Sequence, residues 1–172
     1  MDPLQAQFEQ GVGDRFAAWL SSTSGEPCTF LRRADRAPDL VYFFKRFELL
    51  VEVTAVYYDH EHAAFLWKGA RDAPDAPDRW AGESPHESLA AAIRSRIFDK
   101  SKKRYGSNTV LLIEVPPGLT TAERLMSLVE RQPHTAETPF VGIYVVGTFP
   151  ISTYSAGGYR VLPIKSMKQH EA

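Results

Sequence analysis

The feature that most constrains this chain is a pair of apolar runs separated by two residues. Leu40–Lys45 ("LVYFFK") and Glu48–Tyr58 ("ELLVEVTAVYY") are rich in β-branched and aromatic residues, as strands are. We expect a tight turn centred on Lys45 and Arg46 to join them as an antiparallel hairpin. A third candidate strand, Ala63–Lys68 ("AAFLWK"), follows and extends the hairpin into a meander.

The remaining apolar patterns predict helices and strands in alternation. Apolar residues at intervals of four predict a helix from Pro3 to Leu20, followed by a Ser/Gly/Pro link up to the hairpin. A Pro-rich, acidic loop is expected over residues 69–87. After it we expect a helix capped by Ser84 or Ser88 and reaching about Tyr105, a strand Val110–Val115, a helix Thr121–Glu130, a strand Phe140–Phe149 and a strand Tyr159–Ile164. Alternation of this kind requires crossovers and parallel pairing. The sequence therefore predicts a single α/β domain over residues 1–172, with a mixed sheet, an antiparallel hairpin and flanking helices.

Charge and cysteine content exclude several classes of function. A formal net charge of −1 at pH 7 gives no global attraction to nucleic acid or to an anionic membrane, so such a partner must meet a local patch. Cys28 is the single cysteine, which excludes an internal disulfide and a zinc site built from several cysteines. The longest apolar runs are strand-sized, and the first ten residues lack the features of a secretory signal. We expect a cytoplasmic protein with no membrane partner.

The predicted hairpin brings two acids together. Alternation along its second strand places Val51 and Val53 on the face expected to be buried and Glu52 on the opposite face. The expected turn pairs Asp39 with Glu52, so their Cβ atoms would lie roughly 5 Å apart. Carboxylates this close repel each other unless one holds a proton or both bind a divalent cation, for which oxygen ligands favour Mg²⁺ or Mn²⁺. Alternatively, Glu52 lies on a solvated face and pairs with an arginine such as Arg33.

The segment "PDLVYFFKRFELLVEVT", Pro38–Thr54, resembles the signature of the PD-(D/E)xK, or restriction-endonuclease-like, nuclease superfamily. The resemblance implies that Asp39 and Glu52 are the motif acids and hold Mg²⁺ with help from the Val53 carbonyl. It also implies a core of a helix, antiparallel strands carrying the motif, a second helix and a further strand, which agrees with the predicted order. The chain departs from the signature at Thr54, which stands where the family has lysine. A hydroxyl supplies no positive charge to a transition state.

The predicted helix after the loop offers lysines that can substitute. At about 100° per residue, Lys100 falls within the apolar stripe and points toward the sheet, whereas Lys102 faces away. Some members of the superfamily carry a displaced lysine on this helix, and "IFDKSKKRYG" resembles their I-x-x-K-x-x-K stretch followed by tyrosine. The resemblance implies that Lys100, or else Lys103, takes the role. A lysine near a helix end can instead interact with the last carbonyls or extend past the apolar face. Some members also use a glutamate of the first helix, and Glu9 is the candidate here unless it faces solvent.

The same helix carries the strongest positive cluster of the chain. Its six basic residues fall within eleven positions, and they are Arg94, Arg96, Lys100, Lys102, Lys103 and Arg104. Such a run either binds phosphates or forms an ordinary solvated face. We expect Arg94, Arg96, Lys102, Lys103 and Arg104 to contact nucleic acid if the protein binds it.

Together these features predict a Mg²⁺- or Mn²⁺-dependent endonuclease, with DNA favoured over RNA as substrate. The catalytic candidates are Asp39, Glu52, Thr54, Lys100 and Lys103, and the metal ligands are Asp39, Glu52 and Val53. A homodimer suits a small domain that acts on duplex DNA. Two alternatives stay open: a non-catalytic module of the same fold that binds nucleic acid or a protein through the basic helix 94–104, and an interaction protein of unrelated α/β fold.

Overall fold

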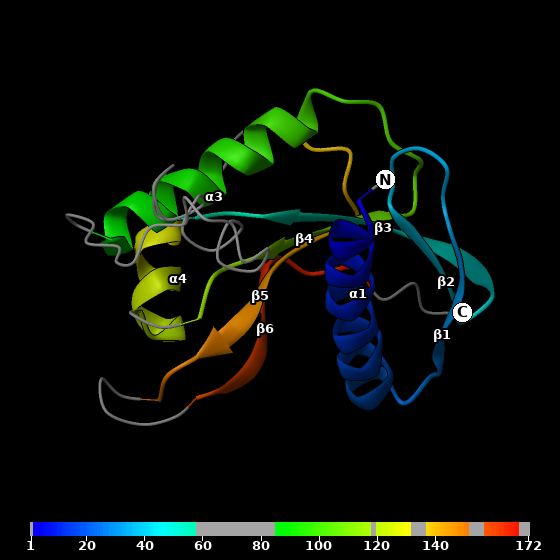
Figure 1. Ribbon diagram of the computed structural model, residues 1–172, viewed down its shortest axis with the longest axis horizontal. Coiled ribbons are helices and arrows are strands. Elements are labelled where there is room, and N and C mark those ends of the chain that lie inside the picture. The colour runs from blue at the N-terminus through cyan, green and yellow to red at the C-terminus, as the bar shows by residue number, and fades with distance from the viewer. Residues whose placement is uncertain (1, 58–84, 118–119, 132–136, 152–156, 169–172) are drawn as a thin grey trace.

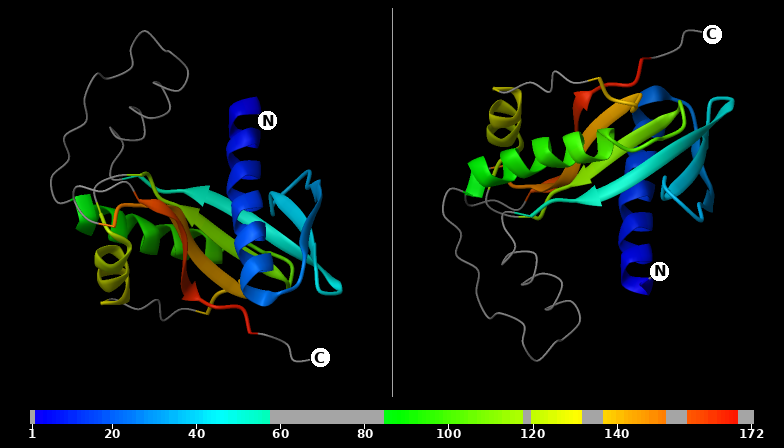
Figure 2. Two further views of the ribbon diagram at one scale, coloured as in Figure 1. Left: turned by 90° about the horizontal axis from the view of Figure 1, so that it is seen from below. Right: turned by 90° about the horizontal axis from the view of Figure 1, so that it is seen from above.

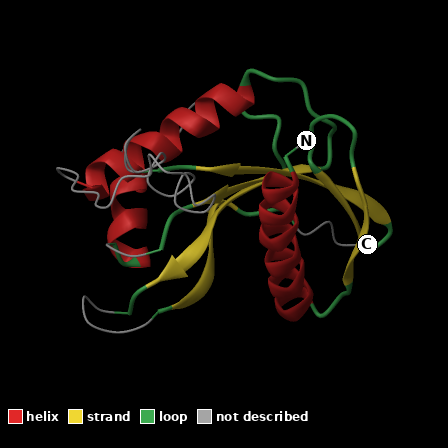
Figure 3. Ribbon diagram, in the orientation of Figure 1, coloured by secondary structure: helices red, strands yellow, loops and turns green. Residues whose placement is uncertain are grey.

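The structure of the protein is a computed structural model that describes residues 2–57, 85–117, 120–131, 137–151 and 157–168. Within these ranges one mixed sheet runs through the molecule, with helices on both faces (Figures 1 and 3). The strands, in sheet order, are β1 (Cys28–Arg33), β2 (Leu40–Phe44), β3 (Phe47–Ala55), β4 (Thr109–Glu114), β5 (Gly142–Phe149) and β6 (Gly158–Lys165). The helices are α1 (Pro3–Ser24), α3 (Pro85–Ser101) and α4 (Ala122–Glu130). The predicted α/β class and mixed sheet are confirmed.

The predicted hairpin forms in the predicted register. β2 and β3 pair antiparallel, with Leu40 opposite Val51 and Phe44 opposite Phe47. Lys45, in the turn, adopts a left-handed conformation with φ of 51°. Continuing this register by one residue beyond the last pair places Asp39 beside β3 at the level of Glu52, which sets the geometry of the candidate site described below.

β1 is a strand that the sequence pattern did not predict. It pairs antiparallel with β2 at the edge of the sheet, and its register shifts between Phe30 and Arg32. Its four central residues are exposed, so the run shows none of the apolar alternation that marks a half-buried strand. With β1 in place, the motif strands belong to a three-stranded antiparallel unit. From β3 to β5 the sheet is parallel, because β3 pairs parallel with β4 and β4 with β5, and β6 then pairs antiparallel with β5.

The helices differ from their predicted bounds mainly at their ends. α1 continues to Ser24, and Gly25 ends it in a left-handed conformation with φ of 73°. α3 takes in residues 85–87 of the predicted loop and ends at Ser101, four residues before the predicted end. The rest of that loop, the candidate strand Ala63–Lys68 and Tyr58 lie outside the described residues. Among the helices that the structure describes, none combines the length and the apolar character needed to cross a membrane.

Both faces of the central sheet are buried, so the prediction of a single buried face of β3 was wrong. On one face α1 packs over β2, β3 and β4, and on the other α3 and α4 pack over β4 and β5 (Figure 2). Val53 faces the first of these cores, with 5% of its surface exposed, whereas Glu52 faces α3 and is only 2% exposed. The prediction failed because a strand covered on both faces has no solvated side, so apolar and polar residues need not alternate along it.

Candidate active site

A cleft of about 320 Å³ opens where the first half of α1, the start of β2, the end of β3 and the end of α3 meet. It is lined by Gln5, Phe8, Glu9, Asp39, Val53, Thr54, Ala55, Tyr57 and Lys100. Five of the residues singled out in the sequence thus face one opening: Glu9, Asp39, Val53, Thr54 and Lys100. Glu52 lies directly behind them, and its side chain is 3% exposed.

Asp39 immediately precedes β2, and two hydrogen bonds hold it in place. Its Oδ2 accepts a hydrogen bond from the Val53 N–H at 2.8 Å, and its own carbonyl accepts one from the Ala34 N–H at 3.0 Å. Burial raises the pKa of Asp39 to about 6, and the negative charge of Glu52 adds to the rise. The Val53 hydrogen bond and the Lys100 charge oppose it. Asp39 is therefore close enough to Glu52 for each charge to affect the other.

The negative charge of Glu52 is balanced by other residues of the protein. Its Oε1 accepts hydrogen bonds from the Lys100 ammonium and from the Tyr105 hydroxyl, the latter at 3.1 Å. The second oxygen, Oε2, is buried and has no hydrogen-bond partner among the described residues. The predicted pairing of Glu52 with Arg33 was wrong, because Arg33 extends over the α1 face and pairs with Glu9. An ion pair with Lys100 therefore relieves the repulsion between the two acids in the metal-free protein.

Lys100 lies where the helical stripe predicted, pointing from α3 toward the sheet, and its side chain is 16% exposed. Lys103 is placed differently. Because α3 ends at Ser101, Lys103 does not flank the apolar stripe of a helix; it is exposed and does not line the cleft. Of Lys100 and Lys103, only Lys100 contacts Glu52 in the structure.

The main chain of β3 also contributes to the site. The N–H groups of Leu50 and Val56 donate to Asn108 and Glu114, so the even-numbered residues of β3 bond toward β4. Val53 is odd-numbered, and its N–H and C=O are therefore directed toward the β2 side of the strand, where β2 begins at Leu40. The Val53 N–H meets Asp39, and its carbonyl is directed past the start of β2, alongside that aspartate. Thr54, the next residue, places its half-buried side chain on the cleft.

Glu9 is not solvent-facing, because only 4% of its surface is exposed and it lines the cleft from α1. Arg33 forms an ion pair with it and also donates to the Ala6 carbonyl at 2.9 Å. Gln5 donates to the other Glu9 oxygen at 2.9 Å. Glu9 thus adds to the negative field at Asp39 while its own charge is balanced by Arg33.

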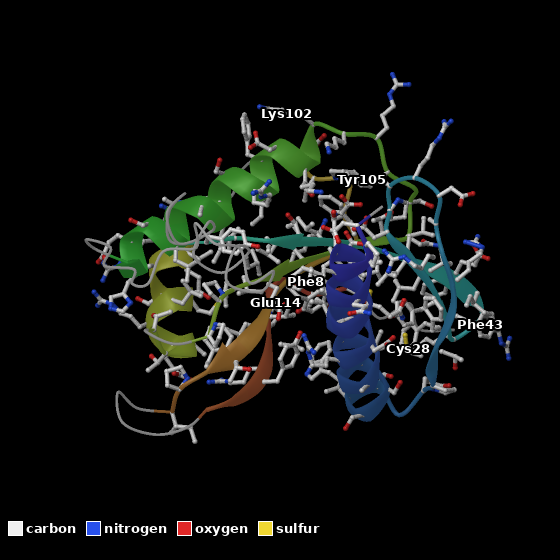
Figure 4. The ribbon with its side chains drawn as sticks, in the orientation of Figure 1. Phe8, Cys28, Phe43, Lys102, Tyr105 and Glu114 are labelled. Atoms are coloured by element: carbon white, nitrogen blue, oxygen red, sulfur yellow. The ribbon has the colours of Figure 1, made fainter. Side chains whose placement is uncertain are left out.

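Fewer residues of the basic cluster are free of contacts within the described protein than the sequence indicated. Arg94 is half-buried and donates to the Leu128 carbonyl at 3.1 Å, so it joins α3 to α4 and does not face a ligand. Lys102 lies past the end of α3, 3.5 Å from Asp99 and 3.8 Å above the ring of Phe98 (Figure 4). Arg96, Lys103 and Arg104 are exposed. The predicted basic helix 94–104 is therefore helical only up to Ser101, and the basic residues after it lie in a loop beside Lys100.

Tyr105 is the site residue to which the sequence gave no role. It lies between the end of α3 and the sheet (Figure 4) and packs on Phe140 with ring centroids 4.8 Å apart. Burial raises the pKa of Tyr105 above its ordinary value, and the adjacent Glu52 charge raises it further, so the phenol stays protonated and donates. The signal available in the sequence was the tyrosine that closes the "KSKKRY" stretch.

Comparison of the chain with protein-family models, with curated proteins and with solved structures gives no match in any of the three. Within the described ranges, no group of three or more His, Cys, Asp or Glu side chains is arranged to hold a metal ion. A cation at this site would therefore rest on two carboxylates and a main-chain carbonyl, with water completing its shell.

Proposed function

We propose that the chain is a metal-dependent nuclease-like protein of restriction-endonuclease-like fold, which hydrolyses nucleic-acid phosphodiester bonds with Mg²⁺ or Mn²⁺ held by Asp39 and Glu52. The order helix, three antiparallel strands, helix, parallel strand in residues 3–114 supports this fold. One observation carries the proposal above the others. Asp39 and Lys100 line one cleft, Glu52 lies buried behind them and pairs with Lys100, and a buried oxygen of this glutamate, Oε2, has no partner among the described residues.

The donor set fits a hard divalent cation. Carboxylate and carbonyl oxygens are the ligands that Mg²⁺ and Mn²⁺ prefer, and a small cation bound through few protein oxygens keeps several waters. The proposed ligands are Asp39, Glu52 Oε2 and the Val53 carbonyl. The raised pKa of Asp39, about 6, is expected of a carboxyl group in a cation site when no cation is bound. When bound, such a cation acidifies a water and offsets phosphate charge.

The other residues of the cleft have roles that follow from their positions. Lys100 places its ammonium group beside the acids, where it can stabilise the added negative charge of a phosphate under attack. Thr54, with a hydroxyl on the cleft, can orient a water. Arg96, Lys103 and Arg104 lie exposed on or after α3 and can hold the phosphates of a nucleic-acid strand.

A second candidate function is a non-catalytic module that binds nucleic acid or a protein partner through the same basic residues. The observation that favours it is the Lys100–Glu52 ion pair, which neutralises the acid without any cation. In that case the motif acids and Lys100 only stabilise the junction of β3 and α3.

Cleavage assays separate the two functions. The purified chain is incubated with single- and double-stranded DNA and RNA, in Mn²⁺ or in EDTA, as wild type and as Glu52→Gln. We expect Mn²⁺-dependent cleavage by wild type and a loss of at least about 100-fold in Glu52→Gln. Glu48→Gln is the matched control, because Glu48 lies on the same strand, is exposed and pairs with Arg32 at 3.1 Å.

The nuclease proposal is rejected if wild type shows no cation-dependent cleavage, or if Glu52→Gln retains the same rate as wild type. Binding of the same nucleic acids without cleavage would support the non-catalytic module.

A further inference from the structure

The two oxygens of Glu52 have different surroundings. Both described donors, the Lys100 ammonium and the Tyr105 hydroxyl, converge on Oε1. Oε2 is equally buried and has no partner among the described residues. A buried carboxylate oxygen left without a hydrogen bond is costly, and beside the second acid, Asp39, Oε2 is an atom that a bound cation would satisfy.

The donors on Oε1 also fix the orientation of the carboxylate. Glu52 has three rotatable side-chain bonds, and its terminal torsion is broad when nothing holds it. Tyr105 is itself held by stacking on Phe140, so its hydroxyl is a fixed donor. With Oε1 held from two directions, Oε2 is presented in one direction only.

We propose that Tyr105 is a positioning residue that, with Lys100, holds Oε1 of Glu52 and so presents Oε2 to a divalent cation, and that these two donors change cation affinity in opposite directions. The inference rests on the cation site proposed above at Asp39 and Glu52. It adds a role for Tyr105 and a second, antagonistic role for Lys100.

The opposite directions follow from charge. Tyr105 is neutral, so it orients the ligand without repelling the cation, and its loss leaves a mobile ligand that binds more weakly. Lys100 donates to the same oxygen but carries a positive charge a few ångströms from Oε2, and this charge opposes a divalent cation at every distance. Removing the charge of Lys100 therefore tightens cation binding even though a hydrogen bond is lost.

The chain supplies a matched control. Tyr159 is a second half-buried tyrosine and lies beside a half-buried glutamate, Glu114, but it donates to no described residue, and its ring centroid lies 4.6 Å from Arg15 Cζ. Removing its hydroxyl has no route to Glu52, so Tyr159→Phe should leave cation binding unchanged.

The test measures the binding of Mn²⁺ alone to the full chain, by electron paramagnetic resonance of free Mn²⁺, with no nucleic acid present. We expect Tyr105→Phe to bind about tenfold more weakly than wild type, and Lys100→Met to bind at least about threefold more tightly. Thermal unfolding establishes that each variant is folded. If Lys100→Met does not fold, Lys100→Gln, which keeps a donor and removes the charge, takes its place with the same expectation.

Shifts of both variants in the same direction would overturn the inference, because a purely structural role of the two donors predicts that both losses weaken binding. An unchanged affinity in Tyr105→Phe would also overturn it. These outcomes leave the proposed cation site standing, since wild type still binds. If wild type does not bind Mn²⁺, the proposed site itself fails and this inference fails with it.

Discussion

Two glutamates on neighbouring strands, the buried Glu52 and the half-buried Glu114, each lie beside one basic residue and one tyrosine. Glu52 on β3 faces α3, with Lys100 and Tyr105, and Glu114 on β4 faces α1, with Arg15 at 3.3 Å. Each has one oxygen paired with its base and a second that is buried without a partner among the described residues. Figure 4 shows Tyr105 and Glu114 on different sides of the sheet.

What separates the two glutamates is their neighbours. Asp39 lies close enough to Glu52 for the Glu52 charge to raise its pKa, whereas burial alone raises the pKa of Glu114 and Arg15 lowers it. Glu52 also borders the cleft through Asp39 and Lys100, which line it, and Glu114 does not line it. A glutamate paired with a basic residue thus occurs on both strands. The second acid at the cleft, Asp39, is what distinguishes Glu52 as part of a candidate cation site.

The largest expected difference between the two regions is in catalysis. Lys100→Ala should lower Mn²⁺-dependent cleavage by about 100- to 1000-fold, because it removes the positive charge nearest the acids. Arg15→Ala should leave the rate within about twofold of wild type, since the described contacts of Arg15 are with the Glu114 carboxylate and the ring of Tyr159. Steady-state cleavage of one labelled substrate measures both. Equal rates in Lys100→Ala and wild type would remove Lys100 from the catalytic machinery.

A second difference is in the stability of the metal-free protein. Lys100→Met leaves Glu52 buried with only the Tyr105 hydroxyl, which should lower the free energy of unfolding by about 3 kcal/mol. Arg15→Met should cost less than about 1 kcal/mol, because the Arg15 side chain is 47% exposed and Glu114 is 18% exposed. Urea unfolding in EDTA gives both values. Mn²⁺ should stabilise both variants, because both keep Asp39 and Glu52, but it should stabilise Lys100→Met by more than Arg15→Met. An equal gain in the two variants would contradict the opposition between Lys100 and the cation.

The smallest expected effect is pH-dependent. The pKa of Asp39 is raised from 3.8 to about 6, so between these values the folded protein keeps a proton that the unfolded chain has lost. Stability contributed by this proton is present below pH 4 and is lost as the pH rises through 6. Asp39→Asn keeps an acceptor for the Val53 N–H and has no proton to lose. It should therefore be more stable than wild type by about 1 kcal/mol at pH 8, after allowance for solvent screening, and by little at pH 4.

Urea unfolding of metal-free protein at the two pH values checks this expectation. Asp35→Asn, an exposed neighbour, serves as the control. Because Glu52 is the second cause of the shift, the gain from Asp39→Asn should shrink in a Glu52→Gln background and persist in Glu114→Gln. A gain that is the same at both pH values would show that Asp39 carries no raised pKa.

The parts of the site that could be predicted are those set by local periodicity. The turn at Lys45 fixed the register of β2 and β3, and the helical stripe placed Lys100 toward the sheet. Both follow from repeat geometry alone, because a strand alternates every two residues and a helix repeats every 3.6. The same reasoning gave the order of the other described helices and strands, but not β1.

The parts that could not be predicted depend on contacts distant in sequence. β1 is an exposed edge strand whose pairing with β2 leaves no apolar pattern. The hydrogen bond from Tyr105 to Glu52 spans more than fifty positions and depends on where α3 ends, which no capping residue marked. The resemblance to PD-(D/E)xK nucleases pointed to Asp39, Glu52 and Lys100. The structure adds that Asp39 and Lys100 line one cleft and that Glu52 lies behind it, paired with Lys100.

The central claim is that Asp39 and Glu52 share one divalent cation, and direct titration with Mn²⁺ tests it most plainly. The account predicts one saturable site in wild type and in Glu114→Gln, and its loss in both Asp39→Asn and Glu52→Gln. Equal binding by all four proteins, or loss of binding in Glu114→Gln alone, would contradict the account and would leave the Glu52 cluster, like that of Glu114, as a structural ion pair.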